Sequence, residues 1–329
     1  MLRKKIKLIL KIAISAALLF ILFSKVGINE PLSLLKNVDF GILLIIFILS
    51  IIVFFIGSLN LKILANKLNK QIGIWRLFSY YTTSHSIGNL LPGKFGDLSI
   101  LYFLKKDGLK IGESSALYIL DKAISLALLL LASLVGMFIF IEPLGVEIIT
   151  LLFALLLILF FFLFVYKKIF IFARKILGTY LQKFDGFQST IKIYLKHGKK
   201  EIFYNFILTV FRLLLSALVI LLAFKSIDPD IQIRFIHVVI IYALTTIISL
   251  LPISLSGLGI RESMAVILYS YINVSPQLSL SAYLLLLIFK VFFTALFIIM
   301  YFIVGHAKSN SSLDLLPKHN PPLILFIIH

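Results

Sequence analysis

The sequence predicts an all-α polytopic membrane protein with about six to eight transmembrane helices in a single membrane domain, residues 1–329. Three observations support this class. Hydrophobic residues make up 61% of the chain and charged residues 14%, whereas soluble domains have roughly 45–50% and 25%. The mean hydropathy is +1.10. Several apolar runs meet or approach the roughly 20 residues of a spanning helix: Phe40–Gly57, Ala123–Ile141, Ile148–Tyr166, Ile202–Phe224 and Leu278–Val304.

The composition also excludes several function classes. There is no cysteine, so disulfides, thiolate zinc sites and cysteine nucleophiles are ruled out. The net charge of +18 lies mainly in short loops, where Lys and Arg set topology and contact anionic headgroups, so we expect no nucleic-acid binding. Walker, His-Glu-x-x-His and Gly-x-Ser-x-Gly motifs do not occur, and the histidines are scattered. We therefore expect no cofactor, no metal and no enzymatic activity, with His85 the one histidine that merits a test.

Loop charges predict which side of the membrane each loop occupies. The basic segment from Arg3 to Lys11 places the N-terminus in the cytoplasm, and we expect the first span to be retained rather than cleaved. The charge-balanced loops at 25–39 and 225–234 face outward. Lys308 and Lys318 place the C-terminus inside. The predicted location is the cell (plasma) membrane, with both termini cytoplasmic.

The segment Leu77–Leu104 lies between two basic loops, so it starts and ends on the same side, yet it is too short for two crossings. Its centre carries the helix-breaking Pro92, with glycines on either side. This pattern predicts a re-entrant hairpin that dips in from the cytoplasm. The alternative is an amphipathic helix on the membrane surface.

A very basic stretch divides the chain into two halves. Residues 167–200 hold nine Lys or Arg against one Asp, which predicts an interfacial cytoplasmic linker over 167–201. The first half is then 1–166, the second half 202–304 and the C-terminal tail 305–329.

The second half contains a matching Pro/Gly segment after Phe235–Leu251. Leu250-Leu251-Pro252 repeats Leu90-Leu91-Pro92, and glycines follow in both copies. The second segment either dips in from outside as a hairpin or joins two complete crossings. The two copies run in opposite directions, which indicates an inverted repeat of the kind found in secondary transporters, although a Leu-rich chain can produce Leu-Leu-Pro by chance.

Polar residues recur at helical spacing inside the predicted spans, and an ionisable residue there costs roughly 2.5–3.5 kcal/mol. One face carries Ser114, Tyr118, Asp121 and Ser125, with Lys122 beside it; others carry Asn205, Thr209, Arg212 and Ser216, then Ser279, Tyr283, Lys290 and Thr294, and Tyr242, Thr245 and Ser249. These stripes predict a shared polar interior. Asp121, Arg212 and Lys290 could alternatively pair with one another only to hold the helices together.

The motifs resemble the lysylphosphatidylglycerol synthase transmembrane, or flippase-like, family, the membrane half of the bacterial multiple peptide resistance factor. The resemblance covers nearly the whole chain and rests on Asn89-x-x-Pro92-Gly93-x-x-Gly96-Asp97, Asp121-Lys122 and Pro252-x-Ser254-x-x-Gly257-x-Gly259-x-Arg261-Glu262. Asp97 replaces the usual Glu, and Asp121-Lys122 replaces Glu-Arg. Lys lacks the bidentate fork of Arg, so headgroup preference is expected to differ. The family's soluble aminoacyl-transferase domain has no counterpart here, so the resemblance implies a stand-alone translocase-like protein.

The leading hypothesis is translocation or binding of an anionic or polyprenyl-linked lipid. In this hypothesis Asp97, Asp121 and Glu262 gate or couple the movement, and Lys94, Arg212, Arg261 and Lys290 hold phosphate. Free N–H groups at the half-helix N-termini after Gly96 and Gly259 would also face an anion. The candidate site residues are Asn89, Pro92, Gly93, Lys94, Gly96, Asp97, Asp121, Lys122, Arg212, Pro252, Ser254, Gly257, Gly259, Arg261, Glu262 and Lys290.

Two alternatives belong to other function classes. One is an intramembrane transferase that acts on a lipid-linked donor, although no nucleophile–base pair is recognisable. The other is a non-catalytic membrane partner of a separate lipid synthase or glycosyltransferase.

Overall fold

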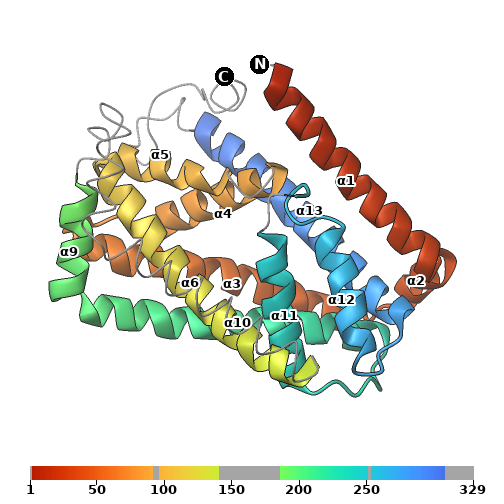
Figure 1. Ribbon diagram of the computed structural model, residues 1–329. Helices are drawn as coiled ribbons and strands as arrows, with labels where there is room; N and C mark the ends of the chain where they lie inside the picture. The colour runs from red at the N-terminus through yellow and green to blue at the C-terminus, as the bar shows by residue number, and fades with distance from the viewer. Residues whose placement is uncertain (1, 92–95, 141–185, 251–252, 308–329) are drawn as a thin grey trace.

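The computed structural model describes residues 2–91, 96–140, 186–250 and 253–307, and in these ranges the chain is all-α, without strands (Figure 1). Four helices are long and apolar enough to cross a membrane: α3 (Phe40–Lys67), α6 (Ile111–Phe140), α10 (Lys199–Ile227) and α13 (Pro276–Ala307). A fifth candidate is α1 (Leu2–Val26), which bends by 87° into α2 (Asn29–Leu34) and η1 (Leu35–Asn37). The predicted Ile148–Tyr166 span and the tail beyond residue 307 lie outside the described residues.

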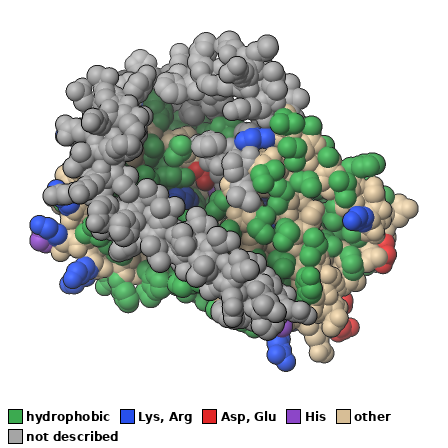
Figure 2. All heavy atoms as spheres, viewed as in Figure 1, with side chains coloured by type: hydrophobic (Ala, Val, Ile, Leu, Met, Phe, Trp, Pro, Cys, Tyr) green, Lys and Arg blue, Asp and Glu red, His purple; other side chains and the backbone are tan. Residues whose placement is uncertain are grey.

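The outer surfaces of these helices are apolar, as expected for helices that face lipid. On α3, residues such as Phe40 and Leu44 are 83% and 60% exposed, and on α13 Val291 is 62% exposed. Figure 2 shows hydrophobic side chains over much of the described surface on one face. A soluble monomer rarely exposes so much contiguous apolar surface. The predicted all-α polytopic membrane fold is therefore confirmed.

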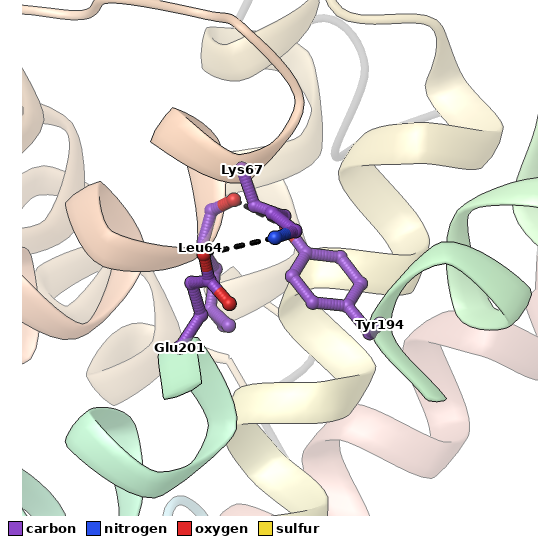
Figure 3. Close-up of polar contacts among 4 residues, drawn as sticks. All are labelled: Leu64, Lys67, Tyr194 and Glu201. Carbon is purple, nitrogen blue, oxygen red and sulfur yellow. Dashed lines mark hydrogen bonds and ion pairs between the residues drawn. The ribbon is translucent and has the colours of Figure 1, made fainter. Parts of the chain in front are cut away.

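The antiparallel helices α3 and α10 form the axis of the bundle and define its two ends. At one end, Lys67 Nζ lies 3.1 Å from Glu201 Oε1, and the Tyr194 hydroxyl of α9 (Phe187–His197) donates to the Leu64 carbonyl (Figure 3). At the other end, the Asp39 amide donates to the Ser226 carbonyl over 2.9 Å. The Asp39 carboxylate then caps α3 by accepting from the amide of Gly41.

We call the Lys67–Glu201 end the basic end. Besides Lys67 it carries Lys70, Arg76, Lys105, Lys106, Lys110, Lys192, Lys196, Lys199 and Lys200, all on or beside the helix termini that meet there. Helices α6 and α10 both start at the basic end, whereas α3 ends there. Helix α6 packs against α9 at the basic end and later contacts α11.

The first Pro/Gly segment is a helical hairpin. Its arms are α4 (Ile74–Leu90) and α5 (Ser99–Lys106), and its mouth is closed at the basic end by an ion pair between Arg76 and Asp107, 2.7 Å apart. The rings of Tyr80 and Phe103 stack across the arms with centroids 5.0 Å apart. Helix α4 packs between α3 and α13, with Tyr80 only 1% exposed, so this arm lies inside the bundle.

The second Pro/Gly segment is also a hairpin, and it enters from the opposite end. Its arms α11 (Phe235–Ser249) and α12 (Ile260–Ser270) have 15 and 11 residues, about 22 and 16 Å at the α-helical rise, so neither arm spans a bilayer core of about 30 Å. The first turns of α11 and the last turns of α12 share one apolar cluster with the C-terminus of α10, where Phe224 packs on Tyr269. The two outer ends of this hairpin therefore lie at the same end of the bundle.

The tips of the two hairpins meet beside α13. The side-chain amide of Asn89, at the end of α4, donates to the Thr294 hydroxyl over 3.0 Å. The Lys290 ammonium donates to the Ser256 carbonyl over 3.2 Å. Helix α1 lies at the edge of the bundle against α12 and α13 (Figure 1). The two hairpins thus enter the bundle from opposite ends, and the inverted repeat itself stays a prediction.

Candidate functional site

Polar side chains from α3, α6, α10 and the first hairpin converge inside the bundle. They surround a cavity lined by Leu61, Tyr81, Ser84, His85, Asp97, Ile100, Tyr118, Asp121 and Lys122. The space open to the centre of a water molecule is about 20 Å³, which is enough for about one water. The cavity is therefore closed to anything as large as a lipid headgroup in the described conformation.

Asp121 is the most deeply buried acid of this cavity, at 1% exposure. Its Oδ1 accepts a hydrogen bond of 3.2 Å from the side-chain amide of Asn205 in α10. Thr209, one turn further along α10, accepts from the Asn60 amide of α3 over 3.0 Å. The acid is thus held by a polar network that joins three spans, which explains how a carboxylate is retained at this depth.

Arg212 links the same network to the first hairpin. Its guanidinium donates to the Tyr81 hydroxyl over 3.1 Å and to the Ser125 hydroxyl over 2.8 Å. Ser125 in turn donates to the Asp121 carbonyl over 2.9 Å. Guanidinium N–H groups can bind a phosphate with the same fork geometry that they use for these hydroxyls. Arg212 therefore sits where it could exchange Tyr81 and Ser125 for an anion.

Lys122 balances the two acids of the cavity. Its ammonium lies 5.4 Å from the ring centroid of Tyr118, and it is close enough to Asp97 and Asp121 to interact with both electrostatically. Two carboxylates and one ammonium therefore line the cavity, and the Arg212 guanidinium lies next to it, bonded to the lining residue Tyr81. Such a site can bind an anion at the cations while the acids limit the net positive charge.

Two glycines allow Asp97 to reach the cavity. A Cβ on Gly96 would lie 2.4 Å from the backbone carbonyl of Ile87, and a Cβ on Gly88 would lie 1.8 Å from Asp97 Oδ1. Both values are far below van der Waals contact. The last turn of α4 and the start of the return arm can approach so closely only without side chains at these positions, which leaves Asp97 9% exposed.

A second polar group surrounds the tip of the second hairpin. The Arg261 guanidinium lies between two aromatic rings, 5.9 Å from the centroid of Tyr242 and 5.8 Å from that of Tyr283. Tyr242 is also within electrostatic range of Arg212, so it lies between the two arginines. Ser254 is fully buried in the same tip.

Glu262 has a different position from the one the sequence suggested. Its carboxylate accepts a hydrogen bond of 2.7 Å from the amide of Gly259, so it caps its own helix α12. The N–H of Gly259 is therefore bonded within the tip, and the expectation that the N–H groups after Gly259 face an anion stays a prediction. Gly257 and Gly259 have φ values of +80° and +82°, which favour glycine.

The structure thus brings most of the predicted residues together in two neighbouring groups. Asp97, Asp121, Lys122 and Arg212 form the first, with Gly96 behind them; Arg261, Glu262, Lys290, Ser254, Gly257 and Gly259 form the second, and Asn89 lies between the tips. Pro92, Gly93, Lys94 and Pro252 lie outside the described residues. Tyr81 and Asn60 were missed. An asparagine within a long apolar run could have indicated Asn60, whereas nothing in the local sequence distinguishes Tyr81.

The mouth of the first hairpin carries a further buried acid. The side chain of Asp107 is only 9% exposed, and this burial raises the pKa of its carboxyl above the usual range, although the Arg76 guanidinium pulls the pKa in the opposite direction. Among the described residues, no group of three or more His, Cys, Asp or Glu side chains is arranged to hold a metal ion.

Comparison with known proteins supports a family assignment. A search of curated proteins finds no match to the chain. The family model described as "Lysylphosphatidylglycerol synthase TM region" matches residues 8–298, nearly the whole chain and every candidate site residue named above. The chain therefore belongs to the family of lysylphosphatidylglycerol synthase transmembrane regions, as an integral, multi-pass membrane protein related to lipid handling.

Proposed function

We propose that this protein binds the phosphate-bearing headgroup of an anionic or polyprenyl-linked lipid inside the bundle and moves the lipid between leaflets. The observation that supports the proposal best is the cavity lined by Lys122, Asp97 and Asp121 between apolar helices, with Arg212 bonded to its lining residue Tyr81. Charges at such depth are costly and usually mark a substrate path. A phosphate oxygen could take the place of Tyr81 and Ser125 on Arg212.

The closed cavity requires a conformational change before a headgroup can enter. The two hairpins reach the centre of the bundle from opposite ends, so movement of one would open the site toward one leaflet and movement of the other toward the second leaflet. This is the geometry of alternating access around a central site. The basic end then faces the cytoplasm by the positive-inside rule, in the plasma membrane, with both termini cytoplasmic.

In this proposal the protein moves the lipid without transferring any chemical group to or from it. Lipids recovered from proteoliposomes and analysed by mass spectrometry should have unchanged masses. A new lipid species formed by the purified protein would instead favour an intramembrane transferase, and activity that depends on a co-purifying synthase or glycosyltransferase would favour the role of a membrane partner.

The proposal is tested by lipid translocation in proteoliposomes with fluorescent phosphatidylglycerol. Arg212→Gln should lower the rate by at least about tenfold, because removing one member of a desolvated charge group costs about 2 kcal/mol or more. The matched control is Glu201→Gln, which removes a charge from the ion pair at the basic end, outside the cavity (Figure 3). Equal rates for Arg212→Gln and wild type, with both proteins folded, would contradict the proposal.

A further inference from the structure

Helix α13 contacts the tips of both hairpins through two residues that are one turn apart. Lys290 Nζ donates to Ser256 of the second tip, to its carbonyl over 3.2 Å and to its hydroxyl over 3.4 Å. Thr294 Oγ1 accepts from Asn89 of the first tip over 3.0 Å. Residues four apart lie on the same helix face, about 6 Å apart along the axis. One short stretch of α13 therefore touches two segments that are more than 150 positions apart in the chain.

Both contacts are made at positions where the hairpin backbone has few helical hydrogen bonds. Ser256 has a φ of +50°, which is uncommon for a residue other than glycine, and the Lys290 contact satisfies its carbonyl in a turn that lacks helical hydrogen bonds. Asn89 is in the last turn of α4, where intrahelical partners for the carbonyls run out. Thr294 is 9% exposed, so water does not easily replace its bond to Asn89.

Aromatic contacts also join α13 to α3 and to both hairpins. Phe293 and Phe297, on the face next to Thr294, pack with Phe54 of α3, and Tyr301 packs on Phe103 in the return arm of the first hairpin. Tyr283 packs on Tyr269 in the second hairpin. A shift or rotation of α13 that releases one tip would thus change its contacts with the other.

We propose that Thr294 and Lys290 are positioning residues through which α13 couples the two hairpin tips, so that release of either tip loosens both. The biological role of this coupling rests on the proposed function: coupled tips would keep the central cavity closed until a lipid headgroup engages it. Its physical content is independent of transport: the stability of one tip depends on the bond that holds the other.

Hydrogen–deuterium exchange of the full chain in lipid nanodiscs tests this coupling without any transport step. Thr294→Val should speed exchange of amides 96–104 by about two- to tenfold, the effect expected from loss of one buried hydrogen bond. It should also speed exchange of amides 254–262, which Thr294 does not touch. Lys290→Met should affect both regions in the same way.

Three further variants make the result decisive. Thr294→Ser keeps the hydroxyl and should behave as wild type. Asn89→Ala should reproduce Thr294→Val, and the two together should add nothing, because both remove the same bond. Ser281→Ala removes a different α13 hydrogen bond, to the Pro31 carbonyl, and should leave both tips unchanged.

The coupling is overturned if each variant changes exchange only in the hairpin that it contacts. It is also overturned if Ser281→Ala loosens both tips as much as Thr294→Val does, since the effect would then reflect general weakening of α13. Either result leaves the lipid-translocation experiment unaffected, so failure of the coupling and failure of the proposed function can be told apart.

Discussion

The two hairpins begin from nearly the same sequence pattern but use it in different ways. In the first, the glycines serve close approach: Gly88 and Gly96 let two backbone segments touch and direct Asp97 into the cavity. In the second, the glycines serve backbone conformation, with positive φ at Gly257 and Gly259. The acid that follows, Glu262, is bonded to its own helix terminus.

The open ends of the two hairpins are also held together by different kinds of contact. The first is closed at the basic end by the ion pair of Arg76 with Asp107, and the second by apolar packing that includes Phe224 and Tyr269. The difference teaches that a repeated Pro/Gly/acid motif predicts a hairpin but not the role of its acid. We therefore assign Asp97 to the proposed binding cavity and Glu262 to the structure of the tip.

The largest expected effect is on the close approach in the first hairpin. Gly96→Ala would put a methyl group 2.4 Å from backbone atoms of Ile87 that cannot rotate away, so we expect a loss of about 3 kcal/mol in unfolding free energy. Thermal unfolding in detergent measures the loss as a lower Tm. Gly73→Ala is the control, because nothing lies within 4 Å of its added Cβ. Equal Tm values for the two variants would show that the tip is not packed as described.

A smaller pair of effects separates the two acids. Glu262→Gln weakens the cap of α12, which should cost about 1 kcal/mol of stability, with translocation per folded molecule unchanged. Asp97→Asn should leave the Tm near that of wild type and lower the translocation rate by about tenfold. Measuring Tm and proteoliposome rate on both variants gives the comparison. The assignment of roles is wrong if Glu262→Gln lowers the translocation rate and Asp97→Asn lowers only the Tm.

The smallest expected effect concerns pH at the mouth of the first hairpin. Because burial raises the pKa of Asp107 in the folded chain, the folded state binds this proton more tightly than the unfolded state does. Stability should therefore fall slightly as the pH rises from the ordinary carboxyl range through the raised pKa. Asp107→Asn should flatten this part of the Tm–pH profile, measured from about pH 4 to 7. A steeper fall of Tm with pH in Asp107→Asn than in wild type would contradict a raised pKa of Asp107.

Much of the fold could be predicted because membrane segments obey simple rules. Apolar length identified α3, α6, α10 and α13, and loop charge indicated a hairpin between Leu77 and Leu104. Helical spacing identified the stripes that carry Asp121 and Arg212. Tertiary geometry decided the rest. Whether the second segment was a hairpin depended on where Tyr269 packs, and the partners of Arg212 depended on Tyr81, 131 positions away. The role of Glu262 depended on a single hydrogen bond to Gly259, which an acid at that position can either make or leave to a ligand.

The position of α1 has a consequence for the order in which the molecule is made. The Ser15 hydroxyl accepts a hydrogen bond from the backbone amide of Leu255, 240 positions later, and a Cβ added to Gly259 would lie 2.9 Å from Leu18 Cβ. At about 5–20 residues per second, the ribosome needs on the order of 10–50 s to produce this partner. Helix α1 therefore makes these contacts only after the second hairpin has been synthesised. Until then the Ser15 hydroxyl has a partner within α1 itself, because it donates to the Lys11 carbonyl over 2.9 Å.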